Sequence, residues 1–221
     1  MRYKHITYRI LFTFGVLTCF IFFGWQWFHR IPDRDIPANS VVVSPANGRI
    51  IYVEKVDNET IHFFKNEVEQ IVDTGMKQSP YVIIVIEMNI HNVHIQRAPI
   101  TGIIVLQDHM QGVFKNAIFS DDKVHLANTN EKTLTVFENE NGGRVGVVQV
   151  AGILARRIES WKVKGDKVAK GEPYGIIKLG SQVVLILPSY IEPLVEIGQV
   201  VVDGETVIGN FPSLFDKILE N

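Results

Sequence analysis

The chain has 221 residues, of which 46% are hydrophobic and 21% charged, with one cysteine and a formal net charge of −2. This composition excludes an intrinsically disordered chain, a collagen-like repeat, a small domain stabilised by disulfides and a cysteine-based zinc site. The length suits one domain plus an appended segment, because single cores are usually built from about 100 to 200 residues.

The N-terminal region holds most of the apolar surplus. No charged side chain occurs from Ile10 to Phe28, and Trp25 and Trp27 lie near the end of this run. A helix rises about 1.5 Å per residue, so the run approaches the ~30 Å hydrocarbon core of a bilayer. A cleaved signal peptide is the alternative, but no small-residue cleavage pattern follows. We expect residues 1–30 to anchor the chain in the cell (inner) membrane; basic residues flank both ends, which leaves the orientation open.

The charge of the remaining chain excludes one class of ligand. Residues 1–30 carry four of the 22 basic residues and no acidic residue, so the remainder has 18 basic and 24 acidic residues. Nucleic acid is therefore not expected as a ligand, because phosphate binding requires clustered Lys and Arg. Residues 31–40, with Pro32 and Pro37, are predicted to be a linker, and residues 41–221 to be the domain.

Beyond the linker the pattern predicts β structure. Short runs rich in Val and Ile recur between Gly, Asn and Asp clusters, and only a final segment, Ser213 to Leu219, has a helical pattern. We expect an all-β barrel or sandwich with one N-terminal transmembrane helix. The predicted strands are Val41–Val43, Arg49–Val56, Tyr81–Ile86, Gly102–Leu106, Thr133–Phe137, Arg144–Val150, Gly175–Leu179, Gln182–Leu187 and Gln199–Val202.

Two segments resemble hairpins of the swapped-hairpin sandwich domains that carry biotin or lipoate. One runs from Val163 to Glu172 around Gly165-Asp166, and the other from Val200 to Val207 around Asp203-Gly204. Neither presents the modified lysine of those carriers. The pattern therefore predicts swapped-hairpin character without carrier function.

Three short motifs contain residues that could perform chemistry, although each alone is ordinary. Residues 44–48 read Ser-Pro-Ala-Asn-Gly, which is a common turn, and residues 179–182 read Leu-Gly-Ser-Gln, which is a common bulge. His91 and His94 are three apart; in a strand they would point to opposite faces, so no metal ion is expected between them.

Taken together and in this order, the motifs resemble the phosphatidylserine decarboxylase family, specifically its short bacterial and archaeal form. The resemblance extends over most of the chain beyond the linker. The segments that carry it are residues 92–102 (NVHIQRAPITG), 127–133 (ANTNEKT), 145–158, which include QVAGILARRI, and 179–181 (LGS).

The resemblance implies a pyruvoyl-dependent enzyme that cleaves its own chain between Gly180 and Ser181. In the family, the serine hydroxyl attacks the glycine carbonyl, and β-elimination and hydrolysis then leave a pyruvoyl group in place of the serine. The step requires a base, and His94 occupies its position. The headgroup amine of phosphatidylserine, or of a related phosphoserine lipid, then forms a Schiff base with the pyruvoyl carbonyl. No external cofactor is implied.

Other residues receive roles from the same resemblance. His91 matches a second histidine that assists decarboxylation in long members of the family. Arg97, Arg156 and Arg157 are candidates to bind the substrate phosphate, because guanidinium groups suit phosphodiesters; a solvated charge at a strand edge is the alternative for each.

Asn47 departs from the family pattern, which has aspartate there as the third member of an Asp-His-Ser triad. An amide cannot stabilise an imidazolium by charge. Asn47 precedes a glycine, a context prone to deamidation, and cleavage is needed only once per molecule. The alternative is an uncleaved, inactive, membrane-anchored relative.

Two other functions are not expected. A transport adaptor would need long heptad hairpins, and a serine hydrolase would need a nucleophile elbow; the sequence has neither. A homo-oligomer is compatible with the sequence.

Overall fold

The computed structural model describes residues 2–57, 60–65, 68–76, 80–111, 130–152, 157–178 and 181–211. The chain divides into two compact units, Met1–Pro32 and Asp33–Asn221, and each is described by itself. The helix expected near the C-terminus lies outside the described residues.

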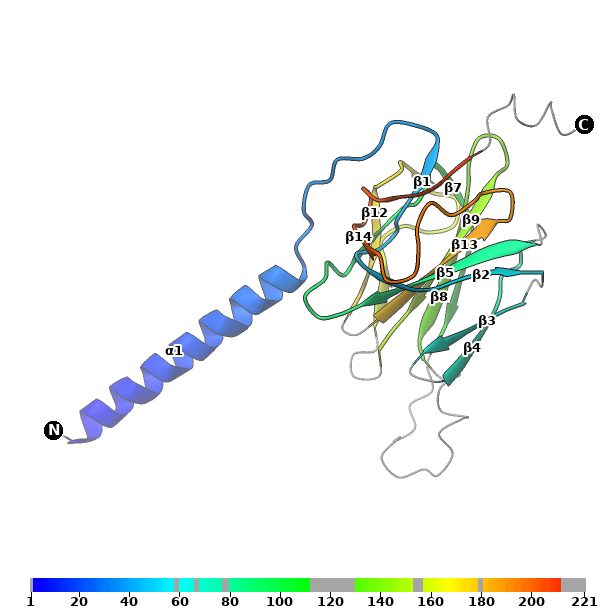
Figure 1. Ribbon diagram of the computed structural model, residues 1–221. Coiled ribbons are helices and arrows are strands. Elements are labelled where there is room, and N and C mark those ends of the chain that lie inside the picture. The colour runs from blue at the N-terminus through cyan, green and yellow to red at the C-terminus, as the bar shows by residue number, and fades with distance from the viewer. Residues whose placement is uncertain are drawn as a thin grey trace, which may run out of the picture. The chain divides into compact units, whose positions relative to one another are not determined.

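The first unit is one long helix, α1 (Arg2–Phe28) (Figure 1). Its segment Leu11–Phe28 is long and apolar enough to cross a membrane, and its side chains are exposed within the structure. Side chains cover carbonyl groups at its C-terminal end: His29 Nδ1 bonds the Trp25 carbonyl at 2.9 Å, and Arg30 Nη1 donates to the Trp27 carbonyl at 2.7 Å. The same two carbonyls also accept main-chain bonds, Trp25 from His29 N at 3.1 Å and Trp27 from Arg30 N at 3.4 Å, so the side chains reinforce the last turn.

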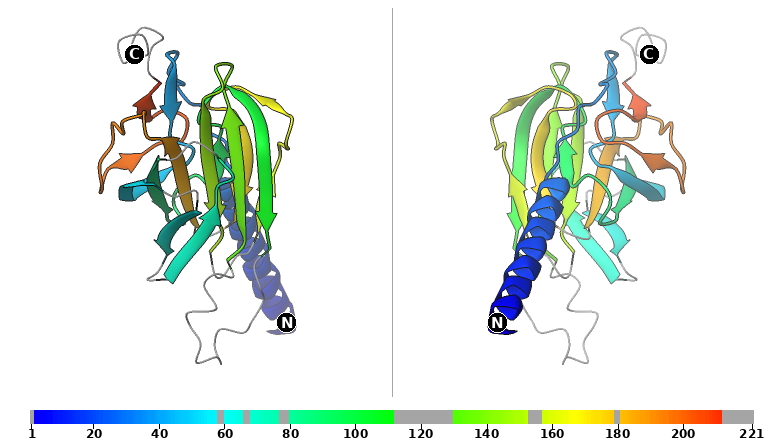
Figure 2. Two further views of the ribbon diagram at one scale, coloured as in Figure 1. Left: turned by 90° about the vertical axis from the view of Figure 1, so that its right-hand side faces the viewer. Right: turned by 90° about the vertical axis from the view of Figure 1, so that its left-hand side faces the viewer.

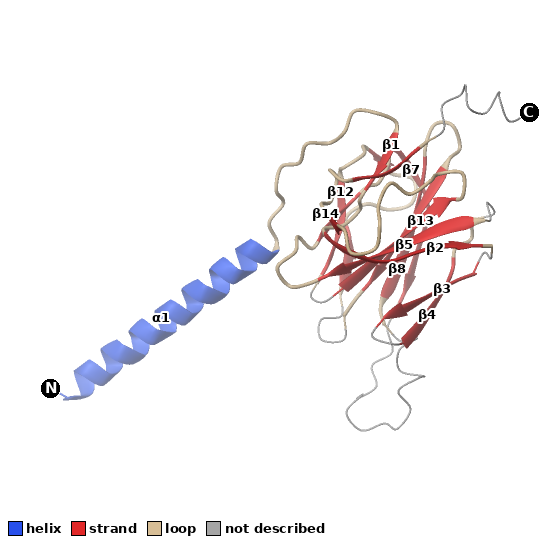
Figure 3. Ribbon diagram, in the orientation of Figure 1, coloured by secondary structure: helices blue, strands red, loops and turns tan. Residues whose placement is uncertain are grey.

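The second unit is mostly β, as Figure 3 shows. Its strands in chain order are β1 (Val41–Val43), β2 (Gly48–Val56), β3 (Thr60–Lys65), β4 (Val68–Asp73), β5 (Tyr81–Met88), β6 (Ile95–Arg97), β7 (Gly102–Met110), β8 (Lys132–Glu138), β9 (Arg144–Val150), β10 (Ile158–Ser160), β11 (Lys167–Val168), β12 (Pro173–Ile177), β13 (Ser181–Pro188), β14 (Val200–Val201) and β15 (Val207–Asn210).

One curled sheet of eight strands organises this unit (Figure 2). Its order is β11-β7-β8-β9-β13-β5-β2-β14, and all its pairings are antiparallel. Three small sheets accompany it, with orders β10-β12-β6, β1-β15 and β3-β4. The central strand β13 is therefore held on both sides, by β9 and by β5.

Apolar side chains pack on both faces of the large sheet. A first cluster contains Leu185 of β13 and side chains of the small sheets, such as Ile177 and Ile208. A second cluster contains Ile186, on the opposite face of β13, and Phe63 of β3. Because both faces are buried, the central strands are continuous apolar runs rather than alternating ones.

The predicted strands all correspond to observed ones, with ends that differ by a few residues, and the all-β fold is confirmed. The strands β3, β4, β6, β10, β11 and β15 were not predicted, because most are short or polar. The expected hairpins are wrong in their pairing: β11 pairs with β7, β14 with β2, and β15 with β1. A turn sequence does not determine which strand its arms will join.

Residues 33–40, which the sequence assigns to a linker, have no helix or strand but contact the β unit. The Arg34 guanidinium bonds the Asp203 carboxylate at 2.6 Å, and Phe211 N donates to the Ser40 carbonyl at 3.3 Å. Ile36 fills space above Gly171, where an added Cβ would lie only 2.3 Å from its Cδ1 atom. This segment is thus packed against the domain rather than free of it.

Candidate active site

Ser181 is the first residue of β13, at the end of the central strand. It pairs with Met88 of β5, and the next residue, Gln182, pairs with both Glu87 of β5 and Val150 of β9. Leu179 and Gly180 lie outside the described residues. The main chain at Ser181 is therefore fixed by its neighbours in the sheet.

His94 is brought to the same end of the sheet by two contacts. Ile177 N, at the end of β12, donates to the His94 carbonyl at 3.1 Å. Gly180 is three residues further along the chain than Ile177, a distance of at most about 10 Å in an extended chain. From the other side, Gln96 Nε2 lies 3.9 Å from the sulfur of Met88, the residue that pairs with Ser181.

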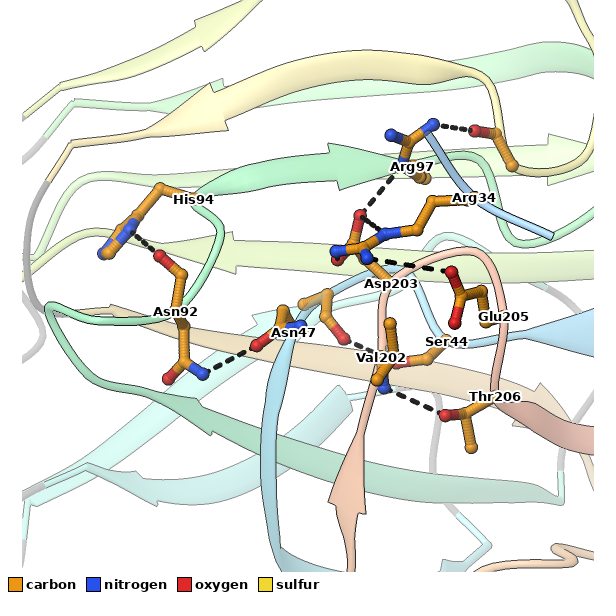
Figure 4. A network of polar contacts seen from close by, with 12 residues as sticks. Arg34, Ser44, Asn47, Asn92, His94, Arg97, Val202, Asp203, Glu205 and Thr206 are labelled. Carbon is orange, nitrogen blue, oxygen red and sulfur yellow. Dashed lines mark hydrogen bonds and ion pairs between the residues drawn. The ribbon is translucent and has the colours of Figure 1, made fainter. Parts of the chain in front are cut away.

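The His94 ring is buried, and one of its nitrogens is oriented by the main chain. Nδ1 lies 3.0 Å from the Asn92 carbonyl oxygen, as Figure 4 shows. Because a carbonyl oxygen only accepts, Nδ1 carries the hydrogen, and the neutral ring keeps its lone pair at Nε2. This is the tautomer that a general base requires.

Asn92 joins Asn47 to His94 (Figure 4). Its Oδ1 accepts from Asn89 N at 2.8 Å, which leaves its Nδ2 to donate to Asn47 Oδ1 at 2.6 Å. Position 47 must therefore provide an acceptor, which asparagine and aspartate both do. Asn92, not Asn47, bonds the ring at Nδ1, so Asn92 is a site residue that the sequence did not reveal.

The turn that carries Asn47 is tied to neighbouring strands. Ser44 Oγ donates to the Ala46 carbonyl at 2.7 Å, and Arg97 N of β6 donates to the Pro45 carbonyl at 2.9 Å. Gly48 lies so close to β5 that an added Cβ would be 2.3 Å from the Glu87 carbonyl oxygen. Glycine is needed here for close approach of two backbones.

A pair of buried glutamines lies behind His94. Gln96 Nε2 donates to the His94 carbonyl at 2.8 Å, and Gln149 Nε2 donates to Gln96 Oε1 at 2.9 Å. Both side chains are fully buried. The family motifs contained both residues, but nothing in the sequence indicated that they would meet, because 52 positions lie between them and only the fold brings them together.

His91 does not share a strand with His94, so the expectation of two strand histidines is wrong. It lies in the turn that Asn89 and Asn92 close, where its N–H donates to Asn89 Oδ1 at 2.9 Å, and its side chain is exposed. His94 directly precedes β6.

The three arginines proposed to bind phosphate have different surroundings. Arg97 is buried, with Nε 2.8 Å from Asp203 Oδ2 and Nη1 2.8 Å from the Gly171 carbonyl oxygen (Figure 4). These contacts favour a structural role for Arg97 and are inconsistent with a solvated strand edge. Arg157 is exposed, and Arg156 lies outside the described residues.

The motif at 127–133 contributes to the same end of the sheet. Glu131 Oε1 accepts from Ile158 N at 2.9 Å, and so holds the segment that follows residues 153–156. Lys132 begins β8, where burial lowers the pKa of its ammonium group. Residues 127–129 lie outside the described part of the chain.

Comparison with known proteins identifies the family of the chain. The sequence model of the family described as phosphatidylserine decarboxylase matches residues 21–209. A phosphatidylserine decarboxylase proenzyme of Trichlorobacter lovleyi is 37% identical over 182 residues, which cover 82% of this chain and 74% of the relative. That of Symbiobacterium thermophilum is 37% identical over 188 residues (85% and 79%), and that of Ruegeria pomeroyi is 32% identical over 212 residues (89% and 90%). The chain belongs to the phosphatidylserine decarboxylase family of carboxy-lyases.

Proposed function

We propose that this protein cleaves itself between Gly180 and Ser181 and then decarboxylates phosphatidylserine to phosphatidylethanolamine. The observation that supports the proposal is that His94, just before β6, and Ser181, the first residue of β13, are both linked to the same end of the sheet. The His94 carbonyl bonds Ile177, and its neighbour Gln96 contacts Met88, the pairing partner of Ser181. The names of the relatives support the substrate.

In the proposed cleavage, His94 is the general base. Its Nε2 takes the proton of the Ser181 hydroxyl while the oxygen attacks the Gly180 carbonyl carbon, and the proton passes to the nitrogen that leaves. The peptide bond is thereby exchanged for an ester. Loss of the Ser181 α-proton then breaks the Cβ–O bond and frees the Gly180 carboxylate. Water hydrolyses the remaining enamine to a pyruvoyl group and ammonia.

The residues around position 181 fit a pyruvoyl group at the start of β13. The position is a strand terminus, and Gln149 provides a buried polar atom close to it. When present, such a group supplies a carbonyl that binds a primary amine and takes up electrons as carbon dioxide leaves. The chain itself would hold the group through the pairing of β13 with β5 and β9.

The fold also supports retention of both chains after cleavage. All eight residues of β13 pair with β5, and five of them pair with β9. Further along, β14 pairs with β2, and β15 with β1. Residues 181–221 would therefore stay bound through several sheet contacts that do not depend on the Gly180–Ser181 bond.

The apolar segment of α1 supports a membrane location for the reaction. A diacyl lipid rarely leaves a bilayer, so an enzyme that acts on it benefits from an anchor in the same membrane. We propose the cell membrane as that location.

Purified protein is expected to consist of two chains, because His94 lies at the end of the sheet where β13 begins and could act as the base for cleavage there. Intact mass measurement under denaturing conditions should give a 41-residue chain, residues 181–221, that begins with a pyruvoyl group. Under native conditions the two chains should elute together. A single uncut chain of 221 residues would contradict the proposal and favour the uncleaved relative.

Replacing Asn47 by aspartate is expected to accelerate cleavage about tenfold. The new carboxylate keeps the acceptor for Asn92 Nδ2 and adds a negative charge near the imidazolium that forms at His94; an opposite charge nearby typically stabilises such a cation by about one pKa unit or more. The control is Asn47→Leu, which leaves Asn92 Nδ2 without this acceptor and should slow cleavage. Freshly translated protein, sampled over time and separated by denaturing electrophoresis, gives the rates. Equal rates for Asn47→Asp and the native chain would show that position 47 has no electrostatic part in cleavage.

A further inference from the structure

The Gln149 carboxamide has an oxygen that the reaction above does not use. Gln149 lies in β9, one residue before its end, and is fully buried. Among the described residues, its Oε1 has no hydrogen-bond partner. Because buried polar atoms normally have a partner, an atom of this kind close to a reaction centre is a candidate for contact with a ligand.

The neighbours of Gln149 determine which of its atoms is left over. The His94 carbonyl only accepts, so Gln96 must present Nε2 to it, and therefore Oε1 to Gln149. Gln149 in turn must present Nε2 to Gln96. This order of donors and acceptors leaves an oxygen at Gln149, which fits a ligand group that donates a hydrogen.

The sheet register places this residue near position 181. Gln149 pairs with Val183, and Ser181 lies two residues earlier on the same strand. Diagonal neighbours in an antiparallel ladder lie about 7–8 Å apart, which a long side chain can reach. Val183 and Met88 belong to the first apolar cluster, so Gln149 lies on the face of the sheet where Gln96 contacts Met88.

We propose that Gln149 Oε1 accepts a hydrogen bond from the nitrogen of the primary amine that binds at position 181. This inference rests on the proposed function, which provides the group that captures the amine. A protonated nitrogen is a strong donor, and a fully buried amide oxygen is an acceptor for which water does not compete. Gln149 thus contributes to the selection of a headgroup that carries a primary amine.

The chain offers a matched control in Gln182. Its side chain is also buried, and its Oε1 also has no partner among the described residues. However, alternation along β13 places it on the face of Val184 and Ile186, whose side chains belong to the second cluster. Gln149→Met and Gln182→Met are therefore the same chemical change on opposite faces of the sheet.

The test measures amine capture rather than turnover. Full-length protein in detergent is incubated with a short-chain phosphatidylserine and cyanoborohydride, and intact mass gives the fraction of the 41-residue chain that carries a reduced adduct. Labelling with hydroxylamine measures, in each variant, how much of that chain has a reactive carbonyl. We expect Gln149→Met to capture the lipid amine about tenfold more slowly per carbonyl, and Gln182→Met within about twofold of the native rate.

The outcomes separate this inference from the function on which it rests. Native protein without a hydroxylamine-reactive 41-residue chain would overturn the proposed function, and the inference with it. Native protein that captures the amine no faster than Gln149→Met would overturn the inference alone. An equal loss in Gln182→Met would also contradict it.

Discussion

His94→Ala protein is expected to remain a single chain of 221 residues. The substitution removes the base whose tautomer the Asn92 carbonyl sets, and loss of a positioned general base typically costs about 10²- to 10⁴-fold in rate. Since cleavage precedes any decarboxylation in the proposed scheme, both activities should be lost together. Intact mass after prolonged incubation checks the first, and release of carbon dioxide from phosphatidylserine checks the second.

A second variant separates loss of the base from loss of the fold. His94→Gln keeps a side-chain donor for the Asn92 carbonyl but has no basic nitrogen, so it should fold and stay uncut. His62→Ala, on an exposed position of β3, is the matched control and should cleave at the native rate. Cleavage of a folded His94→Gln protein at the native rate would show that another group is the base.

The second large effect is expected at Asp203, which is fully buried between two arginines (Figure 4). Arg34 Nη2 lies 2.6 Å from Asp203 Oδ1, and Arg97 Nε lies 2.8 Å from Oδ2. Arg34 belongs to the segment that follows α1, and Arg97 belongs to β6. The carboxylate therefore joins the first residues of the domain to the strand that follows His94.

Asp203→Asn is expected to destabilise the domain by about 3–5 kcal/mol, because it removes the buried negative charge that two guanidinium groups contact. For a domain of this size, that loss corresponds to a melting temperature lower by roughly 10 °C. Thermal unfolding of the full chain in detergent, followed by tryptophan fluorescence, measures the shift.

Glu205→Ala is the control for this prediction. Glu205 also faces Arg34, but at 3.7 Å and with a side chain that is 36% exposed, so its ion pair should contribute less than about 1 kcal/mol. If Asp203→Asn and Glu205→Ala lowered the melting temperature equally, the buried carboxylate would not be the residue that holds the segment in place.

Asp203 also affects the site through the backbone. It begins the turn whose Gly204 N donates to the Ser44 carbonyl at 2.8 Å and whose Thr206 carbonyl accepts from Ser44 N at 2.8 Å. Ser44 begins the segment that leads to Asn47. At a temperature where the Asp203→Asn protein is still folded, it should therefore cleave more slowly than the native chain. Glu205→Ala should not change the cleavage rate in this way.

The family could be predicted from the sequence because its chemistry depends on residue types in a fixed order. The motifs with His94, Gly180 and Ser181 identified the family, and the comparisons confirm it. Asn92 could not be predicted as the partner of the ring, because it acts through a main-chain carbonyl, which every residue has. Arg97 was assigned to a phosphate because the sequence does not show that Asp203, 106 positions away, binds its guanidinium.

By itself, then, the sequence determined the apolar N-terminal helix, the β class and the family, since these depend on local composition, alternation and motif order. Only the tertiary structure decided which strands pair, that residues 33–40 pack against the domain, and that Gln149 reaches the His94 carbonyl through Gln96. The reason is physical: hydrogen bonds and ion pairs between distant residues depend on strand register and burial, and a one-residue change of register would turn each of these side chains to the opposite face of the sheet.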